Sequence, residues 1–376
     1  MDPDGALGHA RPVKILYGVV GEGMGHAIRS RVVIKHLLDQ GHELSIMASG
    51  RAVDFLKKHY GDVKRIQGFH MVYQEGRVQK SKTLWSNVKD TAARGIPKNV
   101  AAYFDLLGSF GPDLVISDFE SWTYLYARAH GLPIISIDNM QIINRCKHSK
   151  KITGQDNTSF RLTRAFIKGK LPGCSHYVIT TFFRPQVRKK RTTLVAPILR
   201  PEVLQADRRE GEHLLVYQTG EGYAALEETL ANTGIECRIY GVRRDITEEQ
   251  VEGNLRFRPF SEHDFIDDLA SARAVIAGGG FTLMGEAVYL RKPMLSVPLR
   301  GQFEQVMNAR YLQRLGYGDW TYDIGDASVV QGFLDRIPAC EEALAGYEQD
   351  GNQALVDILD HLLDRAGAGV LRRASS

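Results

Sequence analysis

Short apolar runs alternate with helical patterns along most of the chain. The first run, Val13–Val20, leads directly into glycines and is followed by a helical pattern from Ala27. Four further runs of this kind follow in the first half, namely Leu44–Met47, Leu114–Ser117, Ile134–Ile137 and Tyr177–Thr180. Helical stretches separate them, such as Trp122–His130, which ends at Gly131-Leu132-Pro133. Strands that alternate with helices predict a parallel sheet covered on both faces.

The alternation starts again in the second half of the chain. The segment Ala196–Pro201 contains two prolines, which resist helix formation, and is interpreted as a linker. Four more apolar runs then follow, namely Leu214–Tyr217, Arg238–Tyr240, Ala274–Ala277 and Met294–Val297. The last helical stretch, Gln353–Leu363, carries apolar residues at helical spacing. The pattern predicts an α/β protein with two doubly wound, Rossmann-like domains, 12–198 and 199–350, and a helix over 351–366 that packs back on the first domain.

Length and composition agree with two ordinary domains. The chain has 376 residues, 43% hydrophobic and 24% charged, and a net charge of +4, which is too small to argue for a nucleic-acid partner. The four cysteines lie far apart, without a C-x-x-C pair, so neither a zinc site nor a disulfide framework is indicated. No apolar run approaches the roughly 20 residues needed to span a bilayer. The first eleven residues lack the apolar core of a signal peptide, so we expect a cytoplasmic protein.

A glycine-rich turn follows the first predicted strand. In Gly21–His26 the backbone N–H groups, those of Gly23 and Gly25 among them, and the helix dipole can receive a polar ligand. A dinucleotide fingerprint would place its third glycine where His26 stands. It would also need an acidic residue at the end of the second strand, where the sequence reads Ala48-Ser49-Gly50. These two departures argue against NAD.

Two polar side chains are expected at the carboxyl edge of the first sheet. His26 follows the first strand and Asp118 ends the strand that begins at Leu114, and ligands of open α/β sheets bind at this edge. An imidazole oriented by a carboxylate is a suitable general base for a sugar hydroxyl. Two other interpretations stay open. His26 could bond its own loop, and Asp118 could cap the helix that follows it.

The stretch Ala277–Ala287 is the most informative in the chain. It follows an apolar strand and opens a helix with Phe281-Thr282, so the glycine N–H groups before that helix can cradle a diphosphate. Glu286, inside the helix, could accept hydrogen bonds from two ribose hydroxyls. After a further strand, Glu304 and Gln305 offer the closely spaced acceptors and donors that a sugar demands. Read singly, such turns are common, and Glu304 could be a solvated helix residue.

In this order the features resemble the donor-binding half of the GT-B glycosyltransferases. That superfamily includes the peptidoglycan N-acetylglucosaminyltransferase that makes lipid II and the UDP-glycosyltransferases of plants and antibiotic producers. The shared motif is a Gly-Gly turn, a ribose-binding Glu, a Pro, an acidic-Gln pair and Asn-Ala, matched here by Gly279-Gly280, Glu286, Pro298, Glu304-Gln305 and Asn308-Ala309. In the first domain, Gly25-His26 matches the turn that carries the base, and Asp118 stands where its partner is found. The run Gly301–Gln305 is most similar to a less characterised bacterial and archaeal branch.

The resemblance implies a GT-B fold in which the acceptor domain, 12–198, and the donor domain, 199–350, face a central cleft. The residues that it implies for the donor are Gly23, Gly25, Thr219, Gly220, Phe260, Ser261, Gly279, Gly280, Phe281, Thr282, Glu286, Glu304 and Gln305. Plant-type enzymes place a diphosphate-binding His where this chain has Gly278, so the diphosphate is expected on backbone N–H groups, with help from the Thr219-Gly220 turn. The donor is expected to be a UDP-sugar, without a further cofactor. No D-x-D motif lies in a loop, so we expect a metal-independent reaction, and the resemblance implies that it inverts the anomeric centre.

A basic stretch lies outside these motifs. Eight Lys and Arg side chains fall between Asn144 and Lys170 against one acid, and the cluster Arg188–Arg191 follows. Three of them share a helical face and are interleaved with apolar side chains: Arg161, Arg164 and Lys168, among Phe160, Phe166 and Ile167. The stretch is either a solvated face or a contact with anionic lipid or an acceptor phosphate, where each cation near the surface contributes about 1 kcal/mol. The second interpretation predicts a peripheral contact with the inner face of the membrane.

The sequence leaves the acceptor open between a lipid-linked, a polyketide-like and another small molecule. Two rival functions also stay open. An epimerase on the same fold would need no acceptor, and a catalytically inactive sensor would bind the sugar nucleotide without turning it over.

Overall fold

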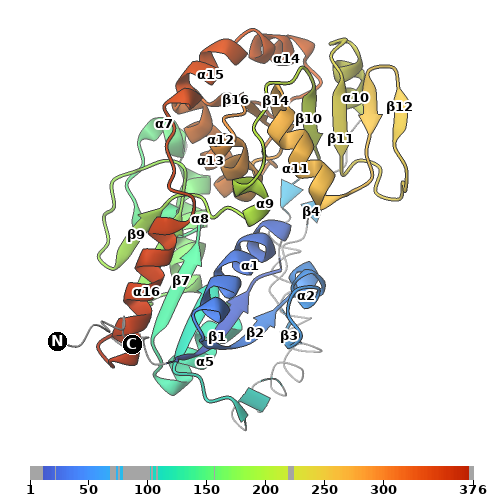
Figure 1. Ribbon diagram of the computed structural model, residues 1–376. Coiled ribbons are helices and arrows are strands. Elements are labelled where there is room, and N and C mark those ends of the chain that lie inside the picture. Colours follow the sequence, from blue (N-terminus) through green and yellow to red (C-terminus); the bar gives the residue numbers. More distant parts are fainter. Residues whose placement is uncertain are drawn as a thin grey trace, which may run out of the picture.

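Two α/β domains make up the protein in a computed structural model that describes residues 12–21, 23–67, 73–74, 77–78, 102, 105–106, 109–155, 157–218 and 224–371. Each domain is built on a seven-stranded sheet. Figure 1 shows the N-terminal domain, in blue and green, below the C-terminal domain, in yellow and orange. A short antiparallel ribbon, β4 (Tyr73–Gln74) with β5 (Arg77–Val78), stands apart from both sheets.

The N-terminal sheet is entirely parallel, in the order β3-β2-β1-β6-β7-β8-β9. Its strands are β1 (Lys14–Val19), β2 (Glu43–Ala48), β3 (Val63–Arg65), β6 (Leu114–Asp118), β7 (Ile134–Asp138), β8 (His176–Thr180) and β9 (Thr192–Val195). The helices of this domain that the structure describes in full are α1 (Met24–Asp39), α2 (Gly50–Lys57), α5 (Ser121–His130), α6 (Ile142–Arg145), α7 (Lys150–Thr153) and α8 (Thr158–Lys170). The strand order reverses between β1 and β6, and such a switch point opens a crevice at the carboxyl ends of the strands.

The C-terminal sheet repeats this plan in the order β12-β13-β11-β10-β14-β15-β16, with β12 as an antiparallel edge. Its strands are β10 (Leu214–Tyr217), β11 (Cys237–Tyr240), β12 (Gln250–Glu252), β13 (Leu255–Phe257), β14 (Ala274–Ala277), β15 (Met294–Ser296) and β16 (Gly318–Trp320). Its helices are α10 (Ala224–Ala231), α11 (Glu262–Ser271), α12 (Phe281–Tyr289), α13 (Phe303–Arg314), α14 (Ala327–Leu334) and α15 (Ile337–Ala345). The linker carries the short helix α9 (Pro201–Leu204).

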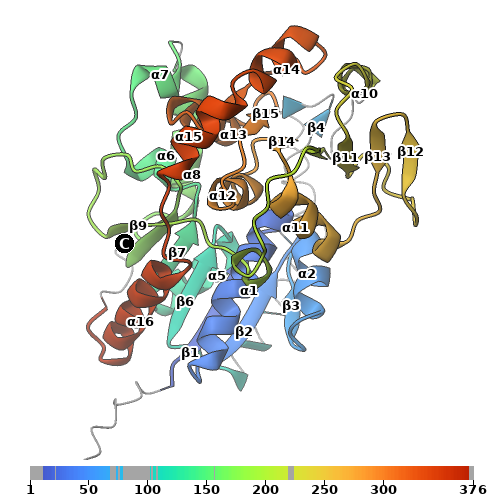
Figure 2. The same cartoon turned by 45° about the horizontal axis from the view of Figure 1, so that its top comes forward.

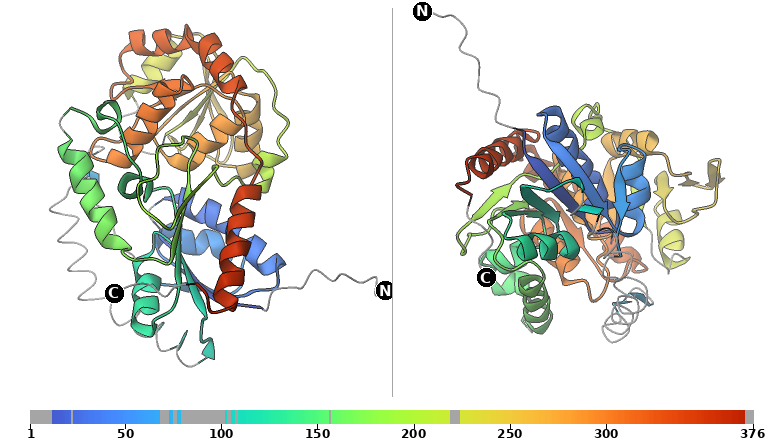
Figure 3. Two further views of the ribbon diagram at one scale, coloured as in Figure 1. Left: turned by 90° about the vertical axis from the view of Figure 1, so that its left-hand side faces the viewer. Right: turned by 90° about the horizontal axis from the view of Figure 1, so that it is seen from below.

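The last helix, α16 (Gln353–Gly367), returns to the N-terminal domain and lies beside its sheet, in red in both views of Figure 3. Its buried leucines, Leu355 and Leu359 among them, share one apolar core with Ile15 and Val13 of the first strand region. The Nε2 atom of His36 in α1 lies 2.8 Å from the Asp360 carboxylate. The apolar face of α16 is therefore covered by the N-terminal domain.

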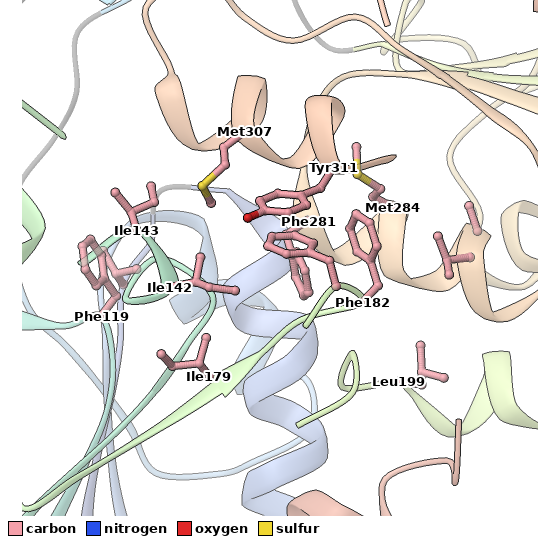
Figure 4. Close-up of a cluster of buried hydrophobic side chains, with 14 of the residues drawn as sticks. Phe119, Ile142, Ile143, Ile179, Phe182, Leu199, Phe281, Met284, Met307 and Tyr311 are labelled. Carbon is pink, nitrogen blue, oxygen red and sulfur yellow. The ribbon is translucent and has the colours of Figure 1, made fainter. Parts of the chain in front are cut away.

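An apolar cluster joins the two domains, as Figure 4 shows. Phe182 and Phe183 follow β8 in the N-terminal domain, whereas Phe281 and Tyr311 belong to α12 and α13 of the C-terminal domain. Phe182 stacks on Phe281 with ring centroids 6.0 Å apart, and Phe183 stacks on Tyr311 at 3.8 Å. We call these four residues and their buried neighbours Met284 and Met307 the interdomain cluster. Because the cluster fixes α12 and α13 against the first domain, the carboxyl edges of the two sheets meet.

Candidate active site

The first turns of α1 and α12 meet where the two domains touch, near the centre of Figure 2. The Thr282 hydroxyl donates to the carbonyl oxygen of Gly25 over 3.3 Å, and a Cβ atom at Gly25 would lie 2.6 Å from that hydroxyl. In the described part of the chain neither helix has a side-chain cap at its N-cap glycine, Gly23 or Gly280. The N–H groups of both first turns, which carry partial positive charge, are thus left for other acceptors.

His26 and Asp118 come together at the edge of the N-terminal sheet. Register pairs Val19 of β1 with Asp118 of β6, and the Nδ1 atom of His26 lies 2.8 Å from a carboxylate oxygen of Asp118. The helix after Asp118 is capped by another residue, because the Glu120 carboxylate accepts from the N–H groups of Trp122 and Thr123. Among the described residues, the ring of His26 contacts Asp118 and Arg29 and no residue of its own loop, and Glu120 takes the cap position that Asp118 was considered for.

Arg29, which was not predicted from the sequence, completes this cluster. Its Nε donates to one Asp118 oxygen over 2.8 Å, and its Nη2 donates to the other oxygen. The same Nη2 lies 2.6 Å from Nδ1 of His26. The Ser30 hydroxyl adds a further hydrogen bond of 3.0 Å to Asp118. Helical spacing was the sequence signal that could have indicated Arg29, since Arg29 and Ser30 fall on the buried face of α1.

Burial and charge set the protonation of the pair. Burial and the Arg29 guanidinium lower the pKa of His26 below its ordinary value of 6.5, although Asp118 acts in the opposite direction. Burial opposes the ionisation of Asp118, but Arg29 and His26 outweigh it and lower the pKa of that carboxyl. A neutral His26 that donates from Nδ1 to Asp118 presents Nε2 as an acceptor. That nitrogen bonds no other residue in the described ranges.

Glu304 faces the N-terminal domain from the first turn of α13. Its Oε1 atom accepts from the side-chain amides of Asn139, over 2.5 Å, and of Asn308, over 3.0 Å. Burial raises the pKa of the Glu304 carboxyl. Within the described residues its Oε2 atom accepts no hydrogen bond, so that oxygen is left for a ligand. Asn139 follows β7 directly and was not predicted from the sequence.

The side chain of Gln305, next to Glu304, forms hydrogen bonds within the C-terminal domain. Its side-chain oxygen accepts from the N–H of Leu299 over 3.0 Å, and its amide nitrogen donates to Gln302. A Cβ atom at Gly279 would lie 2.6 Å from Cβ of Gln305. The glycine at 279 thus permits the close packing of the glycine turn on α13, whereas Gly280 has open space beside it.

The carboxylate of Glu286 is buried, with 1% of the residue exposed, and is already paired. Arg200, at the start of α9, donates to both of its oxygens over 2.8 and 3.0 Å. The third guanidinium nitrogen of Arg200 donates to Glu262 over 2.8 Å. A ribose would have to share the Glu286 oxygens with this arginine, and the pairing was not predicted from the sequence.

The remaining predicted donor residues differ in their surroundings. The ring of Phe281 is buried in the interdomain cluster, so the side chain packs within the protein, and a contact of this residue with the donor stays a prediction. Phe260, after β13, is 73% exposed. Ser261 caps α11 by accepting from the N–H of Asp264 over 3.3 Å. Thr219 and Gly220 lie outside the described residues.

A cavity of about 780 Å³ lies elsewhere, between the linker and the segment that leads to α16. Arg184, Tyr289 and Tyr347 are among its lining residues, and none of the predicted site residues lines it. Across the described ranges, no three His, Cys, Asp or Glu side chains gather in a way that could hold a metal ion. Nor does any helix there have the length and apolar character needed to cross a membrane.

Two Rossmann-like domains that meet at their carboxyl edges are the architecture of the GT-B glycosyltransferases, and known structures match it. The glycosyltransferase of kitacinnamycin has a TM-score of 0.65 at 17% identity, over 93% of this chain and 99% of that chain. MurG of Acinetobacter baumannii has a TM-score of 0.58 at 18% identity, over 93% of this chain and all of that chain.

The sequence comparisons give the family. The family Glycosyl transferase family 1 matches residues 13–338, so the chain belongs to this family and is a glycosyltransferase. An uncharacterized glycosyltransferase of Methanosarcina acetivorans is 26% identical over 81% of this chain and 85% of its own length. One of Methanosarcina mazei is 25% identical over the same shares.

Proposed function

We propose that the protein transfers a sugar from a UDP-sugar to an acceptor hydroxyl, with inversion of the anomeric centre and without a metal ion. The observation that carries this proposal is the meeting of the His26–Asp118 pair with the uncapped first turn of α12. A base thus lies in one domain and a receptor for negative charge lies in the other. Inversion needs this placement, since the attacking oxygen and the leaving group must be on opposite sides of the anomeric carbon.

In the proposed reaction, Nε2 of His26 takes the proton of the acceptor hydroxyl while its oxygen forms a bond to the anomeric carbon. The bond between that carbon and the diphosphate oxygen breaks, and the diphosphate leaves with the electron pair. Asp118 orients the imidazole and stabilises the imidazolium that forms. Such a base contributes typically about 10²–10⁴-fold in rate.

The leaving diphosphate is expected at the turn Gly278–Gly280. The N–H groups and the dipole of α12 stabilise negative charge there by preorganised electrostatics, which can replace a metal ion. Glu286 is proposed to accept from the ribose with the lone pairs that Arg200 leaves, since a carboxylate offers about four acceptor positions. The Oε2 atom of Glu304, which accepts no hydrogen bond from the described residues, is proposed to accept one from a sugar hydroxyl. The backbone of Phe260-Ser261 is proposed to contact the base.

A thermal-shift screen tests the donor. We expect UDP-sugars to stabilise the protein more than dTDP- and GDP-sugars do, since a ligand at about 100 times its Kd adds about 2.7 kcal/mol. Free UDP and free sugar serve as controls, because the intact donor should exceed both. A stronger shift with another nucleotide would reject UDP. Accumulation of free epimerised sugar without any acceptor would favour the epimerase.

We also propose a peripheral contact of α8 with anionic lipid. This helix lies on the outer side of the molecule, in green in the left view of Figure 3, and exposes Leu162 (53%) and Phe166 (48%) beside Arg161 and Lys168. Not all of the basic stretch contributes, because Arg145 is buried and stacks on Tyr177. Apolar side chains among exposed cations suit a membrane surface.

Flotation with anionic vesicles at low salt tests this contact. The double variant Arg161→Glu/Lys168→Glu should stay unbound, and added salt should release the wild type. The double variant Lys57→Glu/Lys58→Glu, which reverses two exposed charges at the end of α2, is the matched control and should bind. A wild type that ignores the vesicles would leave α8 a solvated face.

A further inference from the structure

Arg29 is a buried cation whose guanidinium nitrogens are all engaged. The residue is 3% exposed, and Nε and Nη2 hold both oxygens of Asp118. Its Nη1 donates to the side-chain oxygen of Asn139 over 3.1 Å. The proposed reaction does not itself require an arginine beside the base. A buried charge is costly unless it is paired, so its place here calls for a role.

The chemistry of a histidine–carboxylate pair suggests that role. An ionised carboxylate beside an imidazole favours the protonated ring, and a protonated ring cannot accept a proton from an acceptor hydroxyl. Arg29 donates to both oxygens of Asp118 and so offsets part of the negative charge that acts on His26. It also places its own positive charge 2.6 Å from Nδ1 of His26. Both effects disfavour the imidazolium and oppose the influence of Asp118.

The elements packed around His26 carry further charged side chains. Lys170, at the end of α8, acts in the same direction as Arg29. The acids near the cluster are Asp118 at the end of β6, Asp138 at the end of β7 and Glu304 on α13. Of these, Asp118 is the one within hydrogen-bond distance of His26 among the described residues. The balance on the imidazole is therefore set chiefly between Asp118 and Arg29.

We infer that Arg29 is the positioning residue of this site: it holds Asp118 in place and keeps His26 in the neutral form that accepts a proton. The inference rests on the proposed role of His26 as the base. Asn139 extends it to the donor domain, because its oxygen accepts from Arg29 while its nitrogen donates to Glu304. Glu304 of the C-terminal domain thus holds Asn139, and Asn139 holds the Arg29 guanidinium. The position of Arg29 beside His26 therefore depends on the contact between the two domains.

NMR titration of the His26 ring tests the inference without any substrate. The 12 histidines of the full chain are separated by comparison with His26→Gln, which identifies the signals of that ring. In the wild type we expect a midpoint below 6.5 and the tautomer that carries its proton on Nδ1. Arg29→Met should raise the midpoint by about one pH unit or more, whereas Arg29→Lys, which keeps the charge, should move it less.

The Arg29 substitution is also tested in a second variant, in case Arg29→Met alone does not fold. Arg29→Met leaves Asp118 buried with fewer partners, so the same change is also made on Asp118→Asn, and the resulting double variant contains neither buried charge. The midpoint should again rise on loss of Arg29. An unchanged midpoint in both backgrounds would overturn the inference, as would a wild-type midpoint above 6.5.

Turnover separates this inference from the proposed function. If Arg29 acts through protonation, the acid limb of the rate profile moves to higher pH in Arg29→Met and activity recovers in alkali. A purely structural role predicts an equal loss at every pH. If His26→Ala turns over normally while the NMR midpoint still responds to Arg29, the proposed base is wrong and the charge balance at His26 stands.

Discussion

At the scale of the residue, Glu286 has one observed role, the pairing with Arg200, and one proposed role, the binding of the ribose. Measurements of stability and of UDP affinity can separate the two. Glu286→Ala strands the buried Arg200 with Glu262 alone, and breaking a buried pair typically costs about 3–5 kcal/mol. Glu286→Gln keeps the shape and should cost less. If the carboxylate also binds the ribose, both variants should lose roughly 1.5–3 kcal/mol of UDP affinity. Urea unfolding and calorimetric titration on the same samples check this. Reduced stability with unchanged UDP affinity would make Glu286 structural only.

The sequence could predict His26 and Asp118 because each stands at the carboxyl end of a strand, where the edge of a parallel sheet collects ligands. It could not predict Arg29. A lone arginine in a helical pattern is expected to face solvent, and its partners Asp118 and Asn139 lie 89 and 110 positions away in the chain. Pairings at that distance depend on strand order, which a single sequence does not give. The stacking of Phe281 on Phe182 could not be predicted for a related reason, since the two rings belong to different domains.

At the scale of the element, burial decided which strands were predictable. The central strands, such as β6 and β7, are buried at every position and stand out as continuous apolar runs. The outer strand β9 is half-buried at three of its four positions, and β12 is exposed throughout. Their sequences therefore lack the apolar signal, and neither was predicted.

The helix α16 gives the prediction that belongs to this scale. Leu359 is fully buried in the N-terminal core, so Leu359→Ala should destabilise the protein by about 2–5 kcal/mol through lost burial and a cavity. Asp357→Ala, at an exposed position two residues before it, is the control and should change little. Chemical denaturation measures both. Equal midpoints for the two variants would mean that the helix adds nothing to the domain on which it lies.

At the scale of the whole molecule, each domain carries a different part of the proposed site. In the proposed reaction, the N-terminal domain supplies the base, and the C-terminal domain supplies the glycine turn and the two carboxylates. The interdomain cluster holds the halves in contact, and Arg31 of α1 reinforces it by pairing with Glu202 of α9 over 2.6 Å. A change confined to the base should therefore spare the binding of the donor.

The most direct measurement is made on His26→Ala. Release of UDP from the sugar nucleotide is followed with water as acceptor, and the donor Kd is measured on the same sample. We expect turnover to fall by about 10²–10⁴-fold, as for loss of a general base, while the donor Kd stays within a small factor of the wild type. Normal turnover in a folded His26→Ala protein, or a loss confined to donor affinity, would contradict the account.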